Sequence, residues 1–272
     1  MFQSLIYSYL RRCPIDYGKG FVRKLARLPK GAEKIAFTSP DGIRYKLDLT
    51  NHVMREIFIF GQYEKNTARL LSRMAKEDSV YCDVGANIGA YVLPLSRKIT
   101  KGKIFAFEPN PRALVILNEN LSLNNAAGVE VIPCGLSDKK ETLTLFTPSL
   151  TTASVHKNKD SGEQEIIQLI TLDEFCDSRG IRSIDLMKID IEGHEMQCLQ
   201  GGLNVIQRSK NLVLSVEIDD NCLAGGYSKQ SLFDFVVSLG FRAYAPRGFP
   251  FRMREIRAIP DNYTDNVIFI KK

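Results

Sequence analysis

The densest group of titratable side chains follows an apolar run near the middle of the chain, in the sequence Leu-Met-Lys-Ile-Asp-Ile-Glu-Gly-His-Glu at positions 186–195. Such a run is typical of a buried strand in a parallel sheet, and these sheets bind ligands at the carboxyl ends of their strands. Carboxylates or an imidazole placed there could take a proton from a reacting group. We therefore predict catalytic residues at Asp190 and Glu192, with His194 as a further candidate. The structural alternative is that an acidic residue caps a helix beginning near Glu195 and that His194 lies on the surface.

A second candidate site is the glycine-containing sequence Asp-Val-Gly-Ala-Asn-Ile-Gly at positions 83–89, between a predicted strand and a predicted helix. Glycine lets a ligand approach the backbone closely, and the start of a helix offers unpaired N–H groups. The spacing of Gly85 and Gly89 lacks the third glycine of a dinucleotide-binding G-x-G-x-x-G loop. Asp83 also suits a cationic ligand better than a diphosphate. A plain strand-to-helix turn is the alternative.

Three further acidic or polar positions follow predicted strands. Glu108, in Phe-Ala-Phe-Glu-Pro-Asn at positions 105–110, could accept hydrogen bonds from both hydroxyls of a ribose. Ser137 or Asp138, in Gly-Leu-Ser-Asp at positions 135–138, could meet an adenine edge, although this sequence alone is an ordinary turn. Glu217 closes an apolar run, so we expect it to be either paired or functional, because unpaired burial of a carboxylate is costly.

Alternating strands and helices must position these residues. Apolar runs predict strands at residues 80–84, 103–107, 129–133, 184–189, 212–218 and 266–270. Amphipathic stretches between or before them predict helices at residues 64–74, 88–98, 111–123, 196–208 and 230–239. This alternation predicts an α/β fold with a mostly parallel, doubly wound sheet. Residues 149–165 are polar enough to form a mobile loop or a hairpin connection. The basic, aromatic tail at 247–257 predicts a loop, which could contact an anionic or sugar acceptor.

The N-terminal part differs from this pattern. Residues 2–12 predict an amphipathic helix, which either docks on the domain or contacts a membrane surface, and the Pro-Asp-Gly turn at 40–42 predicts a hairpin. No segment approaches the apolar length needed to span a bilayer, and no signal peptide is indicated.

Composition narrows the class of protein. The chain has 272 residues and a net charge of +6, with its basic residues spread widely, which does not indicate a nucleic-acid partner. The six cysteines include no C-x-x-C pair and predict reduced core thiols in a cytoplasmic protein. We predict no metal site, because the three histidines, His52, His156 and His194, stand far apart in the sequence and the carboxylates alone would bind magnesium only by assumption.

Taken together, the four motifs resemble the FkbM family of methyltransferases, in order and spacing, from about Gly61 to Phe269. The resemblance implies a class I methyltransferase, with a Rossmann-like sheet of seven strands whose last strand runs antiparallel. It implies an N-terminal extension over residues 1–60, a methyltransferase domain over 61–272, and S-adenosylmethionine as cofactor. By the same resemblance, Asp190 and Glu192 lie beside the transferred methyl group, and the cofactor-binding residues are Asp83, Gly85, Asn87, Gly89, Glu108, Asn110, Ser137 and Asp138.

The resemblance also implies O-methylation of a hydroxyl group on a sugar, polysaccharide or secondary metabolite, by in-line displacement at the sulfonium methyl. The acceptor is an analogy, because fold and cofactor motif do not fix it. An NAD-dependent oxidoreductase and an RNA methyltransferase are the alternatives. The first lacks its glycine fingerprint, and the second usually needs an aromatic-lined catalytic loop where this chain has carboxylates.

Overall fold

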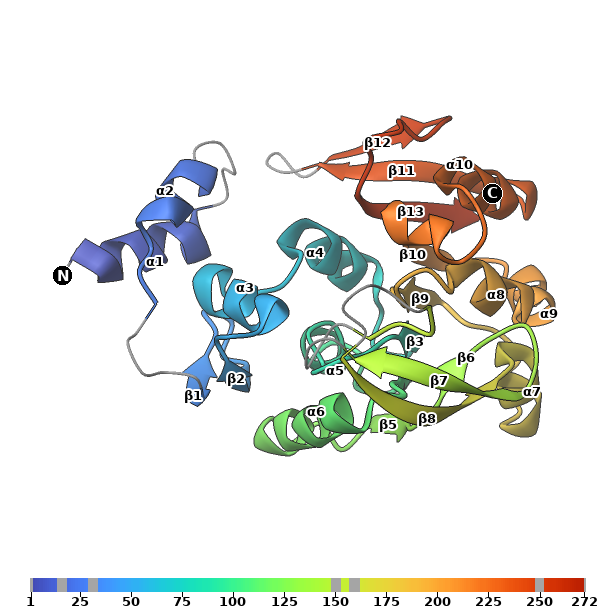
Figure 1. Ribbon diagram of the computed structural model, residues 1–272, viewed down its shortest axis with the longest axis horizontal. Coiled ribbons are helices and arrows are strands. Elements are labelled where there is room, and N and C mark those ends of the chain that lie inside the picture. The colour runs from blue at the N-terminus through green and yellow to red at the C-terminus, as the bar shows by residue number, and fades with distance from the viewer. Residues whose placement is uncertain are drawn as a thin grey trace.

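The centre of the fold is a sheet of eight strands in the order β12-β11-β13-β10-β9-β3-β4-β5 (Figure 1). The structure is a computed structural model that describes residues 2–13, 19–28, 34–147, 153–156, 162–247 and 252–271. The strands of this sheet are β3 (Val80–Val84), β4 (Lys103–Phe107), β5 (Val129–Ile132), β9 (Leu186–Ile189), β10 (Val213–Ile218), β11 (Phe241–Arg247), β12 (Arg252–Ile256) and β13 (Asp265–Lys271).

Most of these strands run in one direction. Strands β5, β4, β3, β9 and β10 pair in parallel, and β13 pairs antiparallel with both β10 and β11. The predicted α/β fold with a mostly parallel sheet and an antiparallel last strand is confirmed. Two strands of this sheet were not predicted, and it has eight strands where the resemblance implied seven. In β11 polar residues and Pro246 interrupt the apolar run, and β12 occupies the tail that we predicted as a loop, where it pairs antiparallel with β11.

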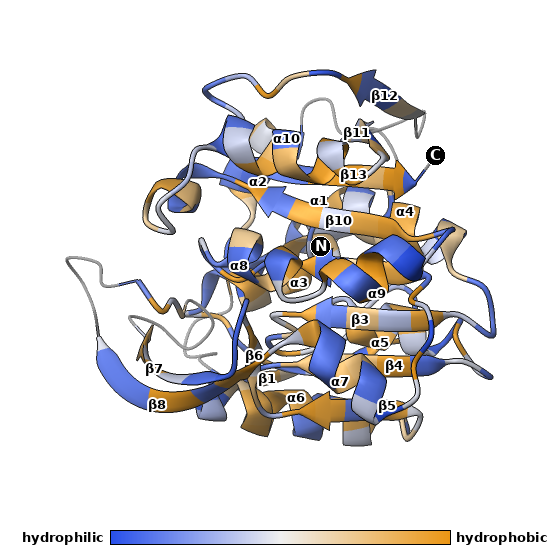
Figure 2. Ribbon diagram, turned by 90° about the vertical axis from the view of Figure 1, so that its right-hand side faces the viewer, coloured by the Kyte–Doolittle hydropathy of each residue, from blue (hydrophilic) through white to orange (hydrophobic). Residues whose placement is uncertain are grey.

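Helices cover both faces of the sheet, and each face has its own hydrophobic core. One core packs the sheet against α7 (Leu172–Ser178), α8 (Glu195–Gln200), α9 (Leu203–Arg208) and α10 (Lys229–Ser238). The other packs it against α3 (His52–Phe60), α4 (Lys65–Met74), α5 (Val92–Ser96) and α6 (Pro111–Leu123). Figure 2 shows the predominantly hydrophobic central strands that these layers bury.

The predicted helices differ from the observed ones where glycine or loop geometry intervenes. The helix predicted at 196–208 is two helices, α8 and α9, separated by Gly201 and Gly202. A Cβ atom on Gly201 would lie 1.9 Å from the carbonyl oxygen of Ser137, so this close approach requires glycine. The helix predicted at 88–98 begins only at Val92, because the glycine-containing loop takes up its first turn. Helix α6 begins at Pro111 after Asn110, whose side chain caps it.

A smaller sheet lies beside the central one. It contains β6 (Gly135–Leu136), β7 (Glu141–Thr147) and β8 (Glu163–Ile170), with β7 and β8 antiparallel and β6 parallel to β8. Residues 163–165 of the segment predicted as a loop or hairpin connection therefore lie in a strand. Residues 148–152 and 157–161 lie outside the described residues.

The N-terminal part consists of two helices and a hairpin. Helices α1 (Phe2–Arg12) and α2 (Lys19–Leu25) lie next to α3, and β1 (Lys34–Thr38) pairs antiparallel with β2 (Arg44–Asp48), as the Pro-Asp-Gly turn predicted (Figure 1). A short 3-10 helix, η1 (Asp220–Leu223), follows β10. The six cysteines are free and five of them are buried. Within the described ranges, no helix is long and apolar enough to cross a membrane.

Candidate active site

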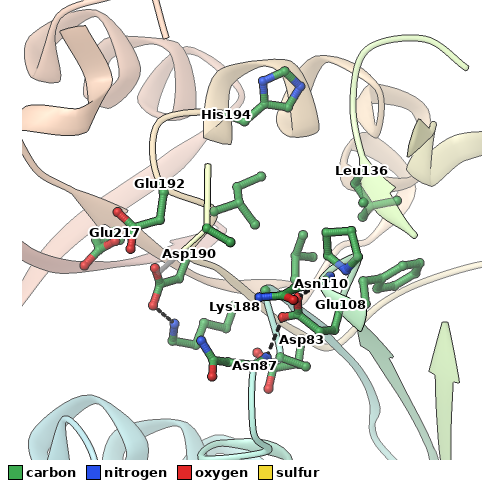
Figure 3. A pocket seen from close by; sticks show the side chains of 18 of the residues that line it. Asp83, Asn87, Glu108, Asn110, Leu136, Lys188, Asp190, Glu192, His194 and Glu217 are labelled. Atoms are coloured by element: carbon green, nitrogen blue, oxygen red, sulfur yellow. Dashed lines mark hydrogen bonds and ion pairs between the residues drawn. The ribbon is translucent and has the colours of Figure 1, made fainter. Parts of the chain in front are cut away.

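The polar pocket lies where the central parallel strands end. Asp83 lies in β3, Glu108 follows β4, Asp190 follows β9 and Glu217 lies near the end of β10, and all four line one pocket (Figure 3). Neighbouring parallel strands bring their carboxyl ends to the same edge of a sheet, which is why residues so distant in sequence meet here. Most of the predicted site residues therefore share one cavity.

The glycine-containing loop packs tightly against the strands beside it. Gly85 has a φ of 84°, and a Cβ atom there would lie 2.0 Å from the carbonyl oxygen of Asp190. The amides of Gly85 and Ala86 both donate to the carbonyl oxygen of Phe107, at 3.0 and 2.9 Å. Only glycine meets both requirements, a positive φ and this close approach. The loop is thus tied to the ends of both β4 and β9.

Asp83 is a buried carboxylate that lacks a partner. Its residue is 1% exposed, and neither side-chain oxygen accepts a hydrogen bond from any of the residues that the structure describes. Burial raises the pKa of Asp83 to about 6, although nearby Lys188 and the hydroxyl of Tyr81 oppose the shift. Burying an unpaired carboxylate is costly, so a ligand with a cationic hydrogen-bond donor would stabilise this arrangement.

Glu108 is fixed by backbone amides on either side. Its Oε2 accepts from the amide of Asn87 and its Oε1 from the amide of Asn110, both at 2.8 Å. Burial raises the pKa of Glu108 to about 7, against the opposing effect of these two hydrogen bonds. Each oxygen keeps a second lone pair, so the carboxylate can still accept two hydroxyl donors. The amides thereby hold it in one orientation.

The segment after β5 enters the pocket through different residues from those predicted. Gly135 and Leu136 line the cavity, whereas Ser137 is fully buried, with its Oγ 3.0 Å from Nε2 of His194 and 3.0 Å from Oδ1 of Asp138. Gly89 packs towards Leu117 of α6. In the structure, Ser137 contacts His194 and Asp138, and Gly89 lies beside Leu117. Cofactor contacts of Ser137, Asp138 and Gly89 stay predictions.

A buried ion pair lies on the opposite side of the pocket from Glu108. Nζ of Lys188 is 2.6 Å from Oδ2 of Asp190 and 4.6 Å from the ring centre of Tyr91. Burial would lower the pKa of Lys188, but Asp190, Glu64 and Asp83 together raise it above its usual value. Burial would raise the pKa of Asp190, but the charge of Lys188 and the hydrogen bonds from Glu217 and Lys188 together lower it. Lys188 and Asp190 therefore both stay charged near neutral pH.

Two more carboxylates complete an acidic cluster, which we define as Glu64, Asp190, Glu192 and Glu217. Oxygens of Glu64, Asp190 and Glu217 lie within 4.8 Å of one another. Glu64 accepts from the hydroxyl of Tyr91 at 2.5 Å and from the side-chain amide of Asn266 at 2.9 Å. Sequence reasoning placed Glu64 only at the start of a predicted helix, because its partners Tyr91 and Asn266 come from distant segments. These three carboxylates have the chemistry to hold a metal ion, but the ammonium of Lys188 already neutralises Asp190.

Glu192 lies in the turn after β9 rather than in the strand. Its φ is 54°, a left-handed conformation, and its Oε2 accepts from the side-chain amide of Asn221 at 2.6 Å. Burial, reinforced by Asp190 and Asp219, raises its pKa to about 8. The alternative that an acidic residue caps the helix beginning at Glu195 is not observed, because the N-cap position is His194 and its side chain makes no capping hydrogen bond. Oε1 of Glu195 instead accepts from the amides of Ile191 and Gly193, within the turn itself.

His194 is buried rather than on the surface. Burial lowers its pKa to about 4, so its ring is neutral at pH 7, and its Nδ1 has no hydrogen-bond partner within the described part of the chain. The ring centre of His156 lies 5.8 Å away, and Nε2 of His156 is 3.0 Å from the carbonyl oxygen of Gly193. His156 and His194 are far apart in the sequence but neighbours in the structure, because the turn after β9 and the segment before β8 meet in space.

The remaining wall of the pocket is apolar and comes from outside the central sheet. Val53 reaches it from α3 and Tyr63 from the turn between α3 and α4, and Leu145, Ile167 and Leu169 reach it from the small sheet. The sequence motifs did not indicate these residues, because they carry no chemistry of their own. The site thus combines a charged floor with a mostly apolar wall.

Residues 83–243, more than half of the chain, match the sequence model of the Methyltransferase FkbM domain. The hexuronic acid methyltransferase AglP of Haloferax volcanii is 37% identical over 157 residues, which cover 57% of this chain and 62% of that protein. The methyltransferase sdnD of Sordaria araneosa is 33% identical over 151 residues, which cover 44% of this chain and 58% of that protein. The 2-O-methyltransferase NoeI of Sinorhizobium fredii is 26% identical, over 66% of this chain and 80% of that protein. The match thus spans less than two thirds of the first two relatives.

Proposed function

This chain belongs to the FkbM methyltransferase domain family, and we propose that it transfers a methyl group from S-adenosylmethionine to an acceptor hydroxyl. The observation that carries the proposal is the unpaired, buried carboxylate of Asp83, which lies in the same pocket as Glu108. The family match supports the sequence-based resemblance and does not favour an oxidoreductase or an RNA methyltransferase.

The cofactor fits these residues by charge and by hydrogen-bonding capacity. When bound, S-adenosylmethionine supplies a methyl group already activated by its sulfonium. Asp83 would bind the ammonium of the methionine part, and the two free lone pairs of Glu108 would accept the ribose hydroxyls. Gly135 and Leu136 line the cavity at the place where the adenine would lie.

The acidic cluster would act on the acceptor. The acceptor oxygen would take the methyl group that the sulfonium activates, and the electron pair of the carbon–sulfur bond would stay on sulfur. The acceptor proton passes to a carboxylate, for which Glu192 is best suited because its pKa of about 8 lies near neutrality. Asp190 would remain ionised beside Lys188 and orient the hydroxyl.

The acceptor class follows from the same side chains. Carboxylates are strong acceptors for sugar hydroxyls, and the relatives AglP and NoeI carry names that specify a hexuronic acid and a 2-O position. We therefore propose a sugar, a polysaccharide or a similarly hydroxylated metabolite. The reacting hydroxyl would face the acidic cluster, and any carboxylate of the acceptor would lie away from Asp190 because like charges repel.

The test separates cofactor binding from turnover. The wild type and the Glu192→Gln and Asp190→Asn variants are titrated calorimetrically with S-adenosylhomocysteine and assayed for transfer of labelled methyl to a panel of sugar acceptors. We expect Glu192→Gln to lower turnover by about 100-fold or more while affinity stays nearly constant, as for loss of a general base. The partly exposed Glu119 gives the matched control, Glu119→Gln.

The outcomes are distinct. Absence of S-adenosylhomocysteine binding by the wild type would refute the methyltransferase proposal. A parallel loss of affinity and turnover in Asp190→Asn would show that this residue holds the cofactor instead of orienting the acceptor.

A further inference from the structure

Helices α1 and α2 form a rigidly attached pair at one end of the molecule (Figure 1). Nε2 of Gln3 donates to the carbonyl oxygen of Leu25 at 3.1 Å, and the hydroxyl of Tyr7 donates to the carbonyl oxygen of Arg27 at 2.7 Å. Ile6 and Leu10 are buried against Ile59 of α3. One face of α1 is therefore used to hold the pair on the rest of the protein.

A different face of the same helices is apolar and exposed. Phe2 is 66% exposed, Leu5 64%, Phe21 70% and Leu25 41%. Residues spaced three or four apart lie on one side of a helix, so Phe2 and Leu5 share a face of α1, and Phe21 and Leu25 share one of α2. The two helices contact each other, and large exposed apolar side chains on neighbouring helices indicate an interaction surface. We name these four residues the apolar patch.

The charge of this segment stands apart from that of the rest of the chain. Residues 1–32 contain seven lysines and arginines and one acidic residue, Asp16, so they carry the whole net charge of +6, and residues 33–272 are neutral overall. Among the described residues of the two helices, Arg12, Arg23 and Lys24 are exposed, and Arg27 is exposed just beyond α2. Exposed basic groups thus lie on the same segment as the apolar patch.

We propose that α1 and α2 form a docking surface for an anionic membrane. Phenylalanine and leucine side chains on an amphipathic helix enter the boundary between headgroups and acyl chains, while lysine and arginine attract anionic headgroups. The charge disfavours a second copy of this chain as the occupant, because two such surfaces would repel each other. Helix α3, on which α1 packs, contributes Val53 to the pocket, so docking would hold the candidate active site beside the membrane.

The test is sedimentation of the full chain with lipid vesicles. One set contains phosphatidylcholine and phosphatidylglycerol at about 70:30, and the other contains phosphatidylcholine alone. We expect binding to the first set to exceed binding to the second by at least about tenfold at low salt, and to fall as salt screens the charges. The variant with Phe2, Leu5, Phe21 and Leu25 all changed to Ser should lose at least about tenfold in vesicle affinity.

Two further variants make the test specific. The Val115→Ser, Val237→Ser double variant removes exposed apolar residues from α6 and α10, and it should bind vesicles as the wild type does. The Arg12→Glu, Lys24→Glu, Arg27→Glu variant should lose binding to the anionic vesicles. Each variant is first checked by its unfolding temperature, which changes at exposed positions should not move.

Three results would overturn the proposal. In the first, the wild type shows no preference for anionic vesicles. In the second, the Val115 and Val237 control loses as much binding as the apolar-patch variant. In the third, the wild type does not bind vesicles but self-associates, and the apolar-patch variant abolishes the self-association. The last result would assign the surface to a second copy of the chain.

Discussion

Replacing Asp83 by Asn removes the negative charge at the position where the proposed cofactor would place its ammonium group. The change keeps the size of the side chain, so the glycine-containing loop beside it should keep its shape. In the wild type the carboxylate interacts with Lys188 and with the hydroxyl of Tyr81, but neither of its oxygens accepts a hydrogen bond of ordinary geometry among the described residues. The effect of the substitution should therefore appear in ligand binding more than in folding.

The expected size follows from the charge and from the pKa. A hydrogen bond to a charged group contributes about 1.5–3 kcal/mol, so Asp83→Asn should weaken S-adenosylhomocysteine binding by about 10- to 150-fold. The pKa of Asp83 is about 6 in the folded protein. Its ionised fraction falls from about nine tenths at pH 7 to about one tenth at pH 5, so wild-type affinity should fall about tenfold over this range.

The assay is calorimetric titration with S-adenosylhomocysteine at several pH values between 5 and 7. The wild type should bind more weakly as the pH falls, because protonation removes the charge that attracts the ammonium, and Asp83→Asn should bind weakly with a much flatter pH profile. Glu108 also has a raised pKa, of about 7, so Glu108→Gln serves as the comparison that isolates its share. Equal affinity of Asp83→Asn and the wild type at pH 7 would refute the assignment.

Two further predictions concern the residues around Asp83. Lys188→Met should lower the free energy of unfolding by about 3–5 kcal/mol in urea titrations, because it leaves Asp190 without its ammonium partner. The same substitution should raise the pKa of Asp190 and so shift the pH profile of methyl transfer to higher pH. Unchanged stability would contradict the ion pair. Gly85→Ala should abolish S-adenosylhomocysteine binding and lower the unfolding temperature more than the control Gly180→Ala does. Both glycines have a positive φ, but a Cβ atom would clash with the carbonyl oxygen of Asp190 at Gly85, whereas Gly180 has open space around it. Equal effects of the two substitutions would show that only backbone strain matters.

The strand ends were predictable from sequence because each motif follows an apolar run that forms a buried strand. Asp83, Glu108 and Asp190 could thus be assigned to one edge of the sheet, where the structure places them in one pocket. Helix α6 was predictable to its first and last residues, since Asn110 and Pro111 provide a strong start signal. The division of the chain at residue 60 and the cytoplasmic location stay predictions.

The rest of the site depends on contacts between distant segments, which local patterns do not contain. Glu64 joins the acidic cluster through Tyr91 and Asn266, and 202 residues separate it from the latter. His194 becomes a buried neutral ring only because Ser137 and His156 come from other elements. The apolar wall from the small sheet also escaped prediction, because polar residues interrupt the apolar ones along β7 and β8 and neither strand forms a continuous apolar run.

The most direct test of the central claim is a crystal structure of the protein with S-adenosylhomocysteine. The account predicts that the amino group lies within hydrogen-bond distance of Asp83, that both ribose hydroxyls contact Glu108, and that the sulfur faces Asp190 and Glu192. A ligand bound outside this pocket, or one whose ribose lies at Asp83 with its amino group elsewhere, would contradict it.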